Sequence, residues 1–140
     1  MQGPVIQMLR GIAGLIVALA VWVIVASVGH RAVCAAWPAY AAATPLLSFS
    51  LPMMIARLAL SAVATLAAGS SARALSNARW LPVTVGCVLV LIFLPMHVGI
   101  WARLPAWYHL TFLASLIPLS VVGARLVRQS RPAANCPVPL

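Results

Sequence analysis

Four long apolar stretches divide this chain of 140 residues, and short segments that carry most of the charge separate them. The first stretch, residues 11–29, holds no charged side chain. At a rise of about 1.5 Å per residue, a helix of this length crosses the roughly 30 Å hydrocarbon core of a bilayer. The sequence therefore predicts an all-α integral membrane bundle, a single domain of four transmembrane helices over residues 11–29, 46–69, 81–101 and 107–127, with a short tail at residues 128–140.

The composition supports a membrane protein and excludes several kinds of chemistry. The chain is 64% hydrophobic and 6% charged, whereas soluble domains carry roughly 25% charged residues. Its charged side chains are nine arginines, and it has no aspartate or glutamate. Paired-carboxylate hydrolysis, magnesium or calcium sites and acid-anchored serine triads all need a carboxylate. We therefore expect no enzymatic activity of the isolated chain, no cofactor and no metal site.

The arginines predict the orientation of the chain. Because they are dispersed between apolar stretches, we expect contacts with anionic lipid head groups and no binding of nucleic acid. Two of the arginines flank one side of the membrane, and six flank the other: Arg31 and Arg103 against Arg10, Arg73, Arg79, Arg125, Arg128 and Arg131. The positive-inside bias then predicts that both termini are cytoplasmic.

The first apolar stretch and the segment after it admit alternatives. A cleaved signal peptide is possible because Arg10 precedes the stretch, but signal-peptide apolar regions usually run about 7 to 15 residues, and no clear Ala-x-Ala cleavage site follows. The segment 30–45 is predicted to be an interfacial connection with Trp37 and Tyr40 as head-group anchors. The second helix is expected to start near Leu46 or Pro52 and to end at residues 69–71.

The third and fourth helices are predicted to form an antiparallel hairpin, because only residues 102–106 separate Trp101 from Trp107. Trp101, Trp107 and Tyr108 are interpreted as anchors at head-group depth. Three prolines are expected to interrupt helices two, three and four and to leave three carbonyls without their helical partner. These are Pro52, Pro95 and Pro118, with the carbonyls of Ser48, Leu91 and Ala114.

Arg57 is the first candidate binding residue, because a guanidinium within a membrane helix costs about 2.5 to 3.5 kcal/mol. The chain offers no acidic partner. Its counter-charge could be a lipid phosphate, an anionic substrate or a carboxylate of a partner subunit, unless backbone carbonyls near Pro95 satisfy it. If helix two begins near Pro52, Arg57 lies about 8 Å below the surface and can instead snorkel toward the head groups.

His97 and His109 are the other candidate binding residues. His97 lies about one turn before Trp101 and His109 two residues after Trp107, so we expect them at similar depth on adjacent helices. With Met96, Met53 and Met54 they could ligate copper or haem, or relay a proton. The alternative is that the histidines are amphipathic anchors and the methionines pack.

Several residues carry a resemblance to known proteins. The run 105–113 (PAWYHLTFL), followed by Pro118, Gly123 and Arg125, and the run 10–14 (RGIAG) resemble small bacterial inner-membrane proteins with four helices and no assigned function. The resemblance implies a bacterial inner-membrane location and no particular activity.

The sequence thus favours a structural or accessory membrane component that contacts lipid or a partner subunit through Arg57, or that assembles as a homo-oligomer. One alternative is a small oligomeric transporter or channel. The other is a metal or haem redox protein that uses His97 and His109.

Overall fold

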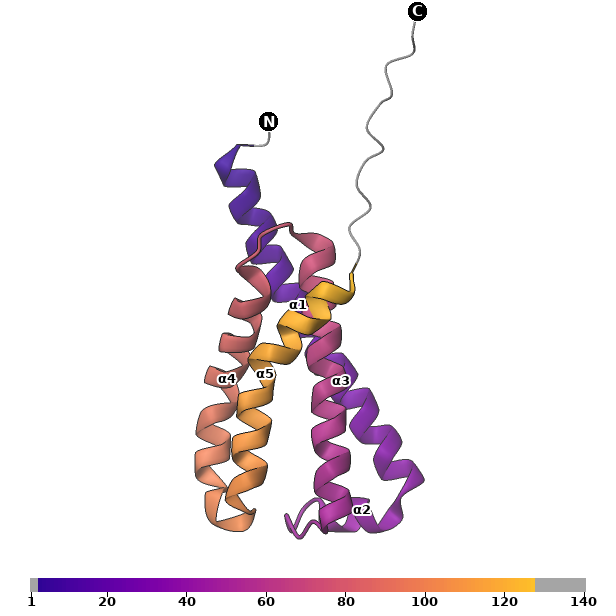
Figure 1. The fold of residues 1–140 in the computed structure, drawn as a ribbon. Coiled ribbons are helices and arrows are strands. Elements are labelled where there is room, and N and C mark those ends of the chain that lie inside the picture. Colours follow the sequence, from indigo (N-terminus) through magenta and orange to yellow (C-terminus); the bar gives the residue numbers. More distant parts are fainter. Residues whose placement is uncertain (1–2, 128–140) are drawn as a thin grey trace, which may run out of the picture.

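The computed structural model describes residues 3–127 and is entirely helical over that range (Figure 1). Its elements are α1 (Pro4–Ala36), α2 (Pro38–Ala43), α3 (Leu51–Leu75), α4 (Leu81–Gly99), the short 3-10 helix η1 (Trp101–Arg103) and α5 (Ala106–Leu126). Four of these helices, α1, α3, α4 and α5, are long and apolar enough to cross a membrane. The predicted all-α class with four candidate transmembrane helices is therefore confirmed. The predicted tail at residues 128–140, with Arg128 and Arg131, lies outside the described residues.

Helix α1 has 33 residues and extends beyond the predicted range 11–29 at both ends. Pro4 occupies the first turn, where a missing N–H breaks no helical hydrogen bond. The helix ends at Ala36 and leaves Trp37 in a non-helical conformation (φ −135°, ψ 85°) before Pro38, because proline disfavours the helical conformation of the residue that precedes it. The predicted connection over residues 30–45 is thus wrong in its first half, which is helical, and its second half contains α2.

Helix α3 begins at Leu51, which supports the later of the two predicted starts. Pro52 therefore lies in the first turn and does not interrupt the helix, contrary to the prediction. The predicted end at residues 69–71 is also wrong, because α3 continues to Leu75. The hydroxyls of Ser70 and Ser71 donate to the carbonyls of Gly123 and Ala68 at 2.8 and 2.9 Å, so these polar residues are accommodated within the helix.

Helices α4 and α5 form the predicted antiparallel hairpin, with η1 in the connection between them (Figure 1). Their bounds agree with the prediction to within two residues, except that Trp101 belongs to η1. Pro95 and Pro118 lie inside α4 and α5, as predicted.

Glycines allow α5 to approach α3 and α4 very closely. A side chain at Gly69 would overlap the backbone of Ser120, and one at Gly123 would overlap the backbone of Leu66. The Ser120 hydroxyl donates to the carbonyl of Pro82 on α4 at 2.6 Å. The pairs α1/α3 and α4/α5 therefore meet tightly toward one end of the bundle and diverge toward the other (Figure 1). We call these the terminal end, where α1 starts and α5 ends, and the hairpin end, where α2 and η1 lie.

Small side chains form the part of the core that α3 contributes, alongside larger buried residues of the other helices. Ala64, Ala68 and Ala72 recur every fourth residue along α3 and are fully buried. Ala18 of α1 is buried with them, and Gly14 faces Leu81, in accord with close helix packing at small residues. The larger apolar side chains are mostly on the outside, which suits a surface surrounded by lipid.

Candidate functional site

A cavity of about 390 Å³ lies between the two diverging helix pairs toward the hairpin end. Volumes of this order are typical of small-molecule sites in proteins. Every helix of the described chain contributes to its wall, except η1. Most of the wall is apolar, and the polar side chains in it are His30, Tyr40, Thr44, Arg57, Ser61, His97 and Tyr108. We call this space the central cavity.

Arg57 lies two turns into α3 and directs its guanidinium into the bundle. Its Nε donates to the hydroxyl of Tyr108 at 3.3 Å, and its Nη1 donates to the hydroxyl of Tyr40 at 3.4 Å. Its Cζ atom lies 4.6 Å from the centre of the Phe49 ring, a cation–π contact. Both hydrogen bonds are longer than the usual 2.7 to about 3.2 Å for N–H···O bonds. The guanidinium is therefore held in place, but its charge is not neutralised within the described chain.

The structure shows which groups accept the hydrogen bonds of Arg57. The chain has two tyrosines, and both hydroxyls accept from this one arginine. The backbone carbonyls near Pro95, considered from the sequence, are not the acceptors of these hydrogen bonds. The side chain contacts groups inside the bundle, and snorkelling toward the head groups stays a prediction.

Two tyrosines were interpreted wrongly from the sequence. Tyr40 and Tyr108 were expected to be head-group anchors, yet they are only 1% and 3% exposed. Trp101 and Trp107, by contrast, are 45% and 41% exposed, as side chains at an interface would be. The signal that could have identified the tyrosines was the composition: a buried arginine in a chain without carboxylates needs other acceptors, and phenol hydroxyls are among the few available.

The predicted juxtaposition of His97 and His109 is confirmed. Their Nδ1 atoms lie 2.8 Å apart, across α4 and α5, and the side chains are 3% and 0% exposed. Such a bond requires one ring to donate its Nδ1–H and the other to accept on an unprotonated Nδ1. The Nε2 atom of His109 is buried without a partner, and the ring of Trp101 stacks on that imidazole at 4.8 Å between centroids.

Met53 and Met54 do not join the two histidines in one cluster, whereas Met96 lines the central cavity together with His97. Met53 packs with Tyr40 and Ala43, while Met54 packs with Leu104 and Tyr108. Within residues 3–127 no group of three or more histidine, cysteine or acidic side chains is placed to hold a metal ion. The histidine pair itself neighbours the central cavity, because His97 forms part of its wall.

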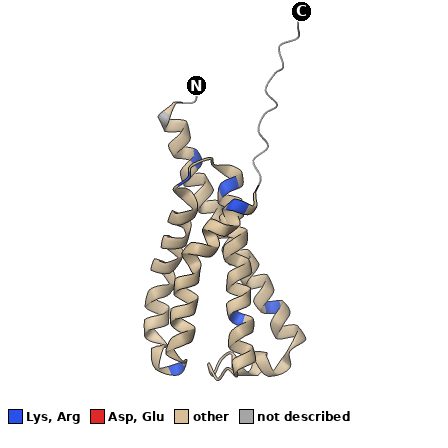
Figure 2. Cartoon of the chain, viewed as in Figure 1, with Lys and Arg blue, Asp and Glu red and all other residues tan. Residues whose placement is uncertain are grey.

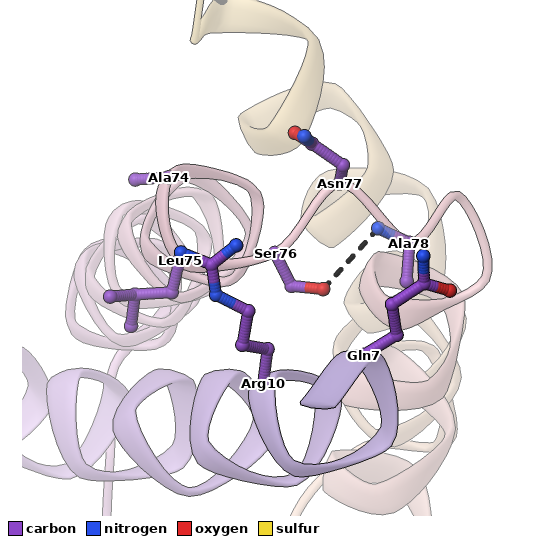
Figure 3. Close-up of a pocket in the computed structure, with 7 residues that line it drawn as sticks. All are labelled: Gln7, Arg10, Ala74, Leu75, Ser76, Asn77 and Ala78. Carbon is purple, nitrogen blue, oxygen red and sulfur yellow. Dashed lines mark hydrogen bonds between the residues drawn. The ribbon is translucent and has the colours of Figure 1, made fainter. Parts of the chain in front are cut away.

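Two further cavities lie at the terminal end of the bundle. One, of about 400 Å³, lies between the start of α1 and the segment that follows α3. Figure 3 shows Gln7 and Arg10 of α1 on one side of it and Ser76 on the other, where the Ser76 hydroxyl accepts a hydrogen bond from the Ala78 N–H at 3.3 Å. The other is lined by three arginines, Arg73, Arg79 and Arg125.

The fold and the cavity together define a class of protein: an all-helical chain with four helices suited to crossing a membrane and a mainly apolar cavity between them. Comparison with models of known protein families, with curated protein sequences and with solved structures finds no match to this chain. The resemblance to small bacterial inner-membrane proteins therefore stays a prediction.

Proposed function

We propose that this protein is an accessory membrane component that binds an anionic, lipid-like molecule in the central cavity. Arg57 is the observation that carries the proposal. Its guanidinium is permanently charged, and the chain contains no carboxylate to pair with it. It lies at the wall of the cavity, where its hydrogen bonds go to two neutral hydroxyls.

The shape and chemistry of the cavity favour an amphiphile. Aromatic side chains of three helices, Trp22, Phe93 and Phe112, contribute to the wall and suit an acyl chain or another apolar body. The Arg57 guanidinium with the Tyr108 hydroxyl suits a carboxylate or phosphate head, since charge-assisted hydrogen bonds are the stronger ones. The bound molecule would supply the negative charge that the chain lacks.

The proposal also includes the membrane in which the protein lies and its orientation there. We place it in the bacterial inner membrane with both termini cytoplasmic, surrounded by lipids with anionic head groups. A carboxylate of a partner subunit is the other candidate for the contact with Arg57. The alternatives of an oligomeric transporter or channel and of a redox protein at His97 and His109 stay predictions.

Binding of palmitate to the detergent-purified protein, followed by native mass spectrometry, tests the proposal. Hexadecanol has the same chain without the charge and is the matched ligand. We expect Arg57→Leu to weaken palmitate binding about tenfold or more, since a hydrogen bond to a charged group contributes about 1.5–3 kcal/mol. Arg57→Lys should retain part of the affinity.

Arg103→Leu is the matched control, because Arg103 is an exposed arginine near the same end of the bundle and does not line the cavity. It should bind palmitate as the native chain does. Equal binding of palmitate and hexadecanol, or equal losses in the Arg57→Leu and Arg103→Leu proteins, would contradict the proposal. A protein subunit that co-purifies with the native chain but not with Arg57→Leu would identify the alternative occupant.

A further inference from the structure

A third cavity, of about 520 Å³, lies at the terminal end and is surrounded by arginines. Arg73 comes from the last turn of α3, Arg79 from the segment before α4, and Arg125 from the last turn of α5. The remainder of the wall is mainly apolar and includes Pro82 and Val121. Figure 2 shows that basic residues gather at this end of the bundle and that no acidic residue is present in the described chain. We call this space the basic cavity.

A bound anion would stabilise the positive charges around the basic cavity. Three arginines, from α3, from the segment before α4 and from α5, line the same cavity, and the chain has no acidic side chain to place between them. Arg73 donates to the Asn77 carbonyl at 2.9 Å, which fixes the end of α3 but supplies no negative charge. Arg79 and Arg125 are exposed. Guanidinium groups bind phosphate through paired, charge-assisted hydrogen bonds, so several of them around one cavity suit a phosphate with its several oxygens.

The position of the basic cavity matches the depth of phospholipid head groups. It lies where α3 and α5 end and α4 begins, which is where the ends of membrane-spanning helices meet the interface. Trp80, next to Arg79, is exposed there and is a typical interfacial side chain. Val83 and Val121 continue the wall along α4 and α5, so that an acyl chain could lie below a phosphate held by the arginines.

We propose that the basic cavity binds a phosphate group, supplied by the head group of an anionic phospholipid or by soluble phosphate. The site is separate from the central cavity, with which it shares no residue. The proposal therefore stands or falls independently of the function proposed for Arg57. Basic pockets between membrane helices are a known means of holding anionic head groups, and here the lipid source is favoured by the depth and the apolar lower wall.

The test compares two double variants of the full chain in nanodiscs of phosphatidylcholine with 20% or no phosphatidylglycerol, a composition of about one anionic lipid in five. Arg79→Gln/Arg125→Gln removes two exposed arginines of the basic cavity. Arg31→Gln/Arg103→Gln removes two exposed arginines that do not line it, so both variants have the same net charge. Phosphatidylglycerol retained after detergent extraction is counted by native mass spectrometry.

We expect the native chain and Arg31→Gln/Arg103→Gln to retain phosphatidylglycerol in preference to phosphatidylcholine. Arg79→Gln/Arg125→Gln should bind it about 25-fold more weakly, since each basic residue near an anionic surface contributes about fivefold. Arg79→Lys/Arg125→Lys should bind phosphatidylglycerol with an affinity between those of the native chain and Arg79→Gln/Arg125→Gln. Circular dichroism of each variant checks that its helices are intact. Equal losses in the two glutamine variants, or no preference for phosphatidylglycerol in the native chain, would overturn the proposal.

Inorganic phosphate distinguishes the two sources. If millimolar phosphate displaces the bound lipid from the native chain, and raises its melting temperature in neutral detergent but not that of Arg79→Gln/Arg125→Gln, the ligand is soluble phosphate. If phosphate does neither while phosphatidylglycerol is retained, the ligand is the lipid head group. Either result supports a phosphate site formed by these arginines.

Discussion

At the level of single residues, the interior of this bundle is governed by a shortage of hydrogen-bond acceptors. Arg57 has no carboxylate to bind, and its acceptors are the hydroxyls of Tyr40 and Tyr108. His97 and His109 likewise satisfy one another across two helices. Arg57 and the two histidines therefore depend on one or two specific neighbours each, and removal of a single neighbour should change the free energy of unfolding measurably.

Replacement of Tyr108 by phenylalanine removes the acceptor of the Arg57 Nε–H and keeps the ring. We expect a loss of about 1.5 kcal/mol in the free energy of unfolding, the lower end of the range for a hydrogen bond that involves a charged group, because this bond is long at 3.3 Å. Denaturation in mixed micelles, followed by circular dichroism, measures it. In an Arg57→Leu background the same change should have almost no effect, because the partner is already absent. Additive losses in the double variant would mean that the hydrogen bond contributes nothing.

Replacement of His97 by phenylalanine should leave both nitrogens of His109 buried without a partner. The ring of His97 stacks on Phe112 at 4.5 Å between centroids, so phenylalanine preserves the shape, and the expected loss of about 1–3 kcal/mol reflects the unpaired imidazole. His97→Phe/His109→Phe should lose less than the sum of the single changes, because removing both partners leaves no orphaned group. The same unfolding measurement checks this, and strictly additive losses would argue against the pair.

At the level of helices, close packing at glycine determines where α5 can cross α3. A Cβ atom at Gly69 would overlap the backbone of Ser120, which cannot rotate away as a side chain could. We expect Gly69→Ala to cost about 2–3 kcal/mol of stability, the upper range for overpacking. Gly99→Ala is the control, because nothing lies within 4 Å of a Cβ placed there, and it should leave stability unchanged. Similar free energies of unfolding for Gly69→Ala and Gly99→Ala would contradict this, because α3 and α5 could then move apart without a loss of stability.

The existence and number of the long helices followed directly from the apolar stretches, because an apolar helix of that length has only lipid as a suitable solvent. Their ends did not follow. Residues 69–71 look like a helix stop in the sequence, but Gly69 packs on α5 and Ser70 bonds to Gly123. These contacts depend on a helix more than 50 residues farther along the chain, so no local pattern could indicate them.

The candidate site was predictable in part for similar reasons. Arg57, His97 and His109 stood out because polar side chains in apolar helices are rare, and hairpin geometry alone placed the two histidines side by side. The partners of Arg57 could not be located, because Tyr40 and Tyr108 lie 17 and 51 residues away in sequence. Aromatic and apolar side chains occur both at membrane interfaces and in buried positions, so the sequence alone does not show that these tyrosines are buried. Their burial follows from the tertiary packing.

At the scale of the whole molecule, the divergence of the two helix pairs separates two kinds of site. Glycines hold the terminal end tightly closed, and the basic cavity lies there among the ends of α3, α4 and α5. The wider hairpin end contains the central cavity with Arg57. If both proposals hold, the protein binds two anions at once, one in the basic cavity at the terminal end and one in the central cavity toward the hairpin end.

The orientation of the molecule decides on which side of the membrane each of the two cavities lies, and it can be predicted. Of the arginines that flank the described helices, Arg10, Arg73, Arg79 and Arg125 lie toward the terminal end, and Arg31 and Arg103 toward the hairpin end. The positive-inside bias then expects the terminal end in the cytoplasm. A green fluorescent protein fused after residue 140 should fluoresce, and alkaline phosphatase fused after Ala102 should be active.

The charge bias also predicts how the orientation responds to mutation. Changing Arg73, Arg79 and Arg125 to glutamine removes three positive charges from one side, so a fraction of the chains should insert in reverse and the phosphatase fused after Ala102 should lose activity. Arg31→Gln/Arg103→Gln should strengthen the native orientation, because it removes positive charge from the opposite side. Phosphatase activity of a fusion after residue 140, together with none after Ala102, would contradict this orientation. The basic cavity and the larger number of arginines would then lie on the outer side of the membrane, against the charge bias.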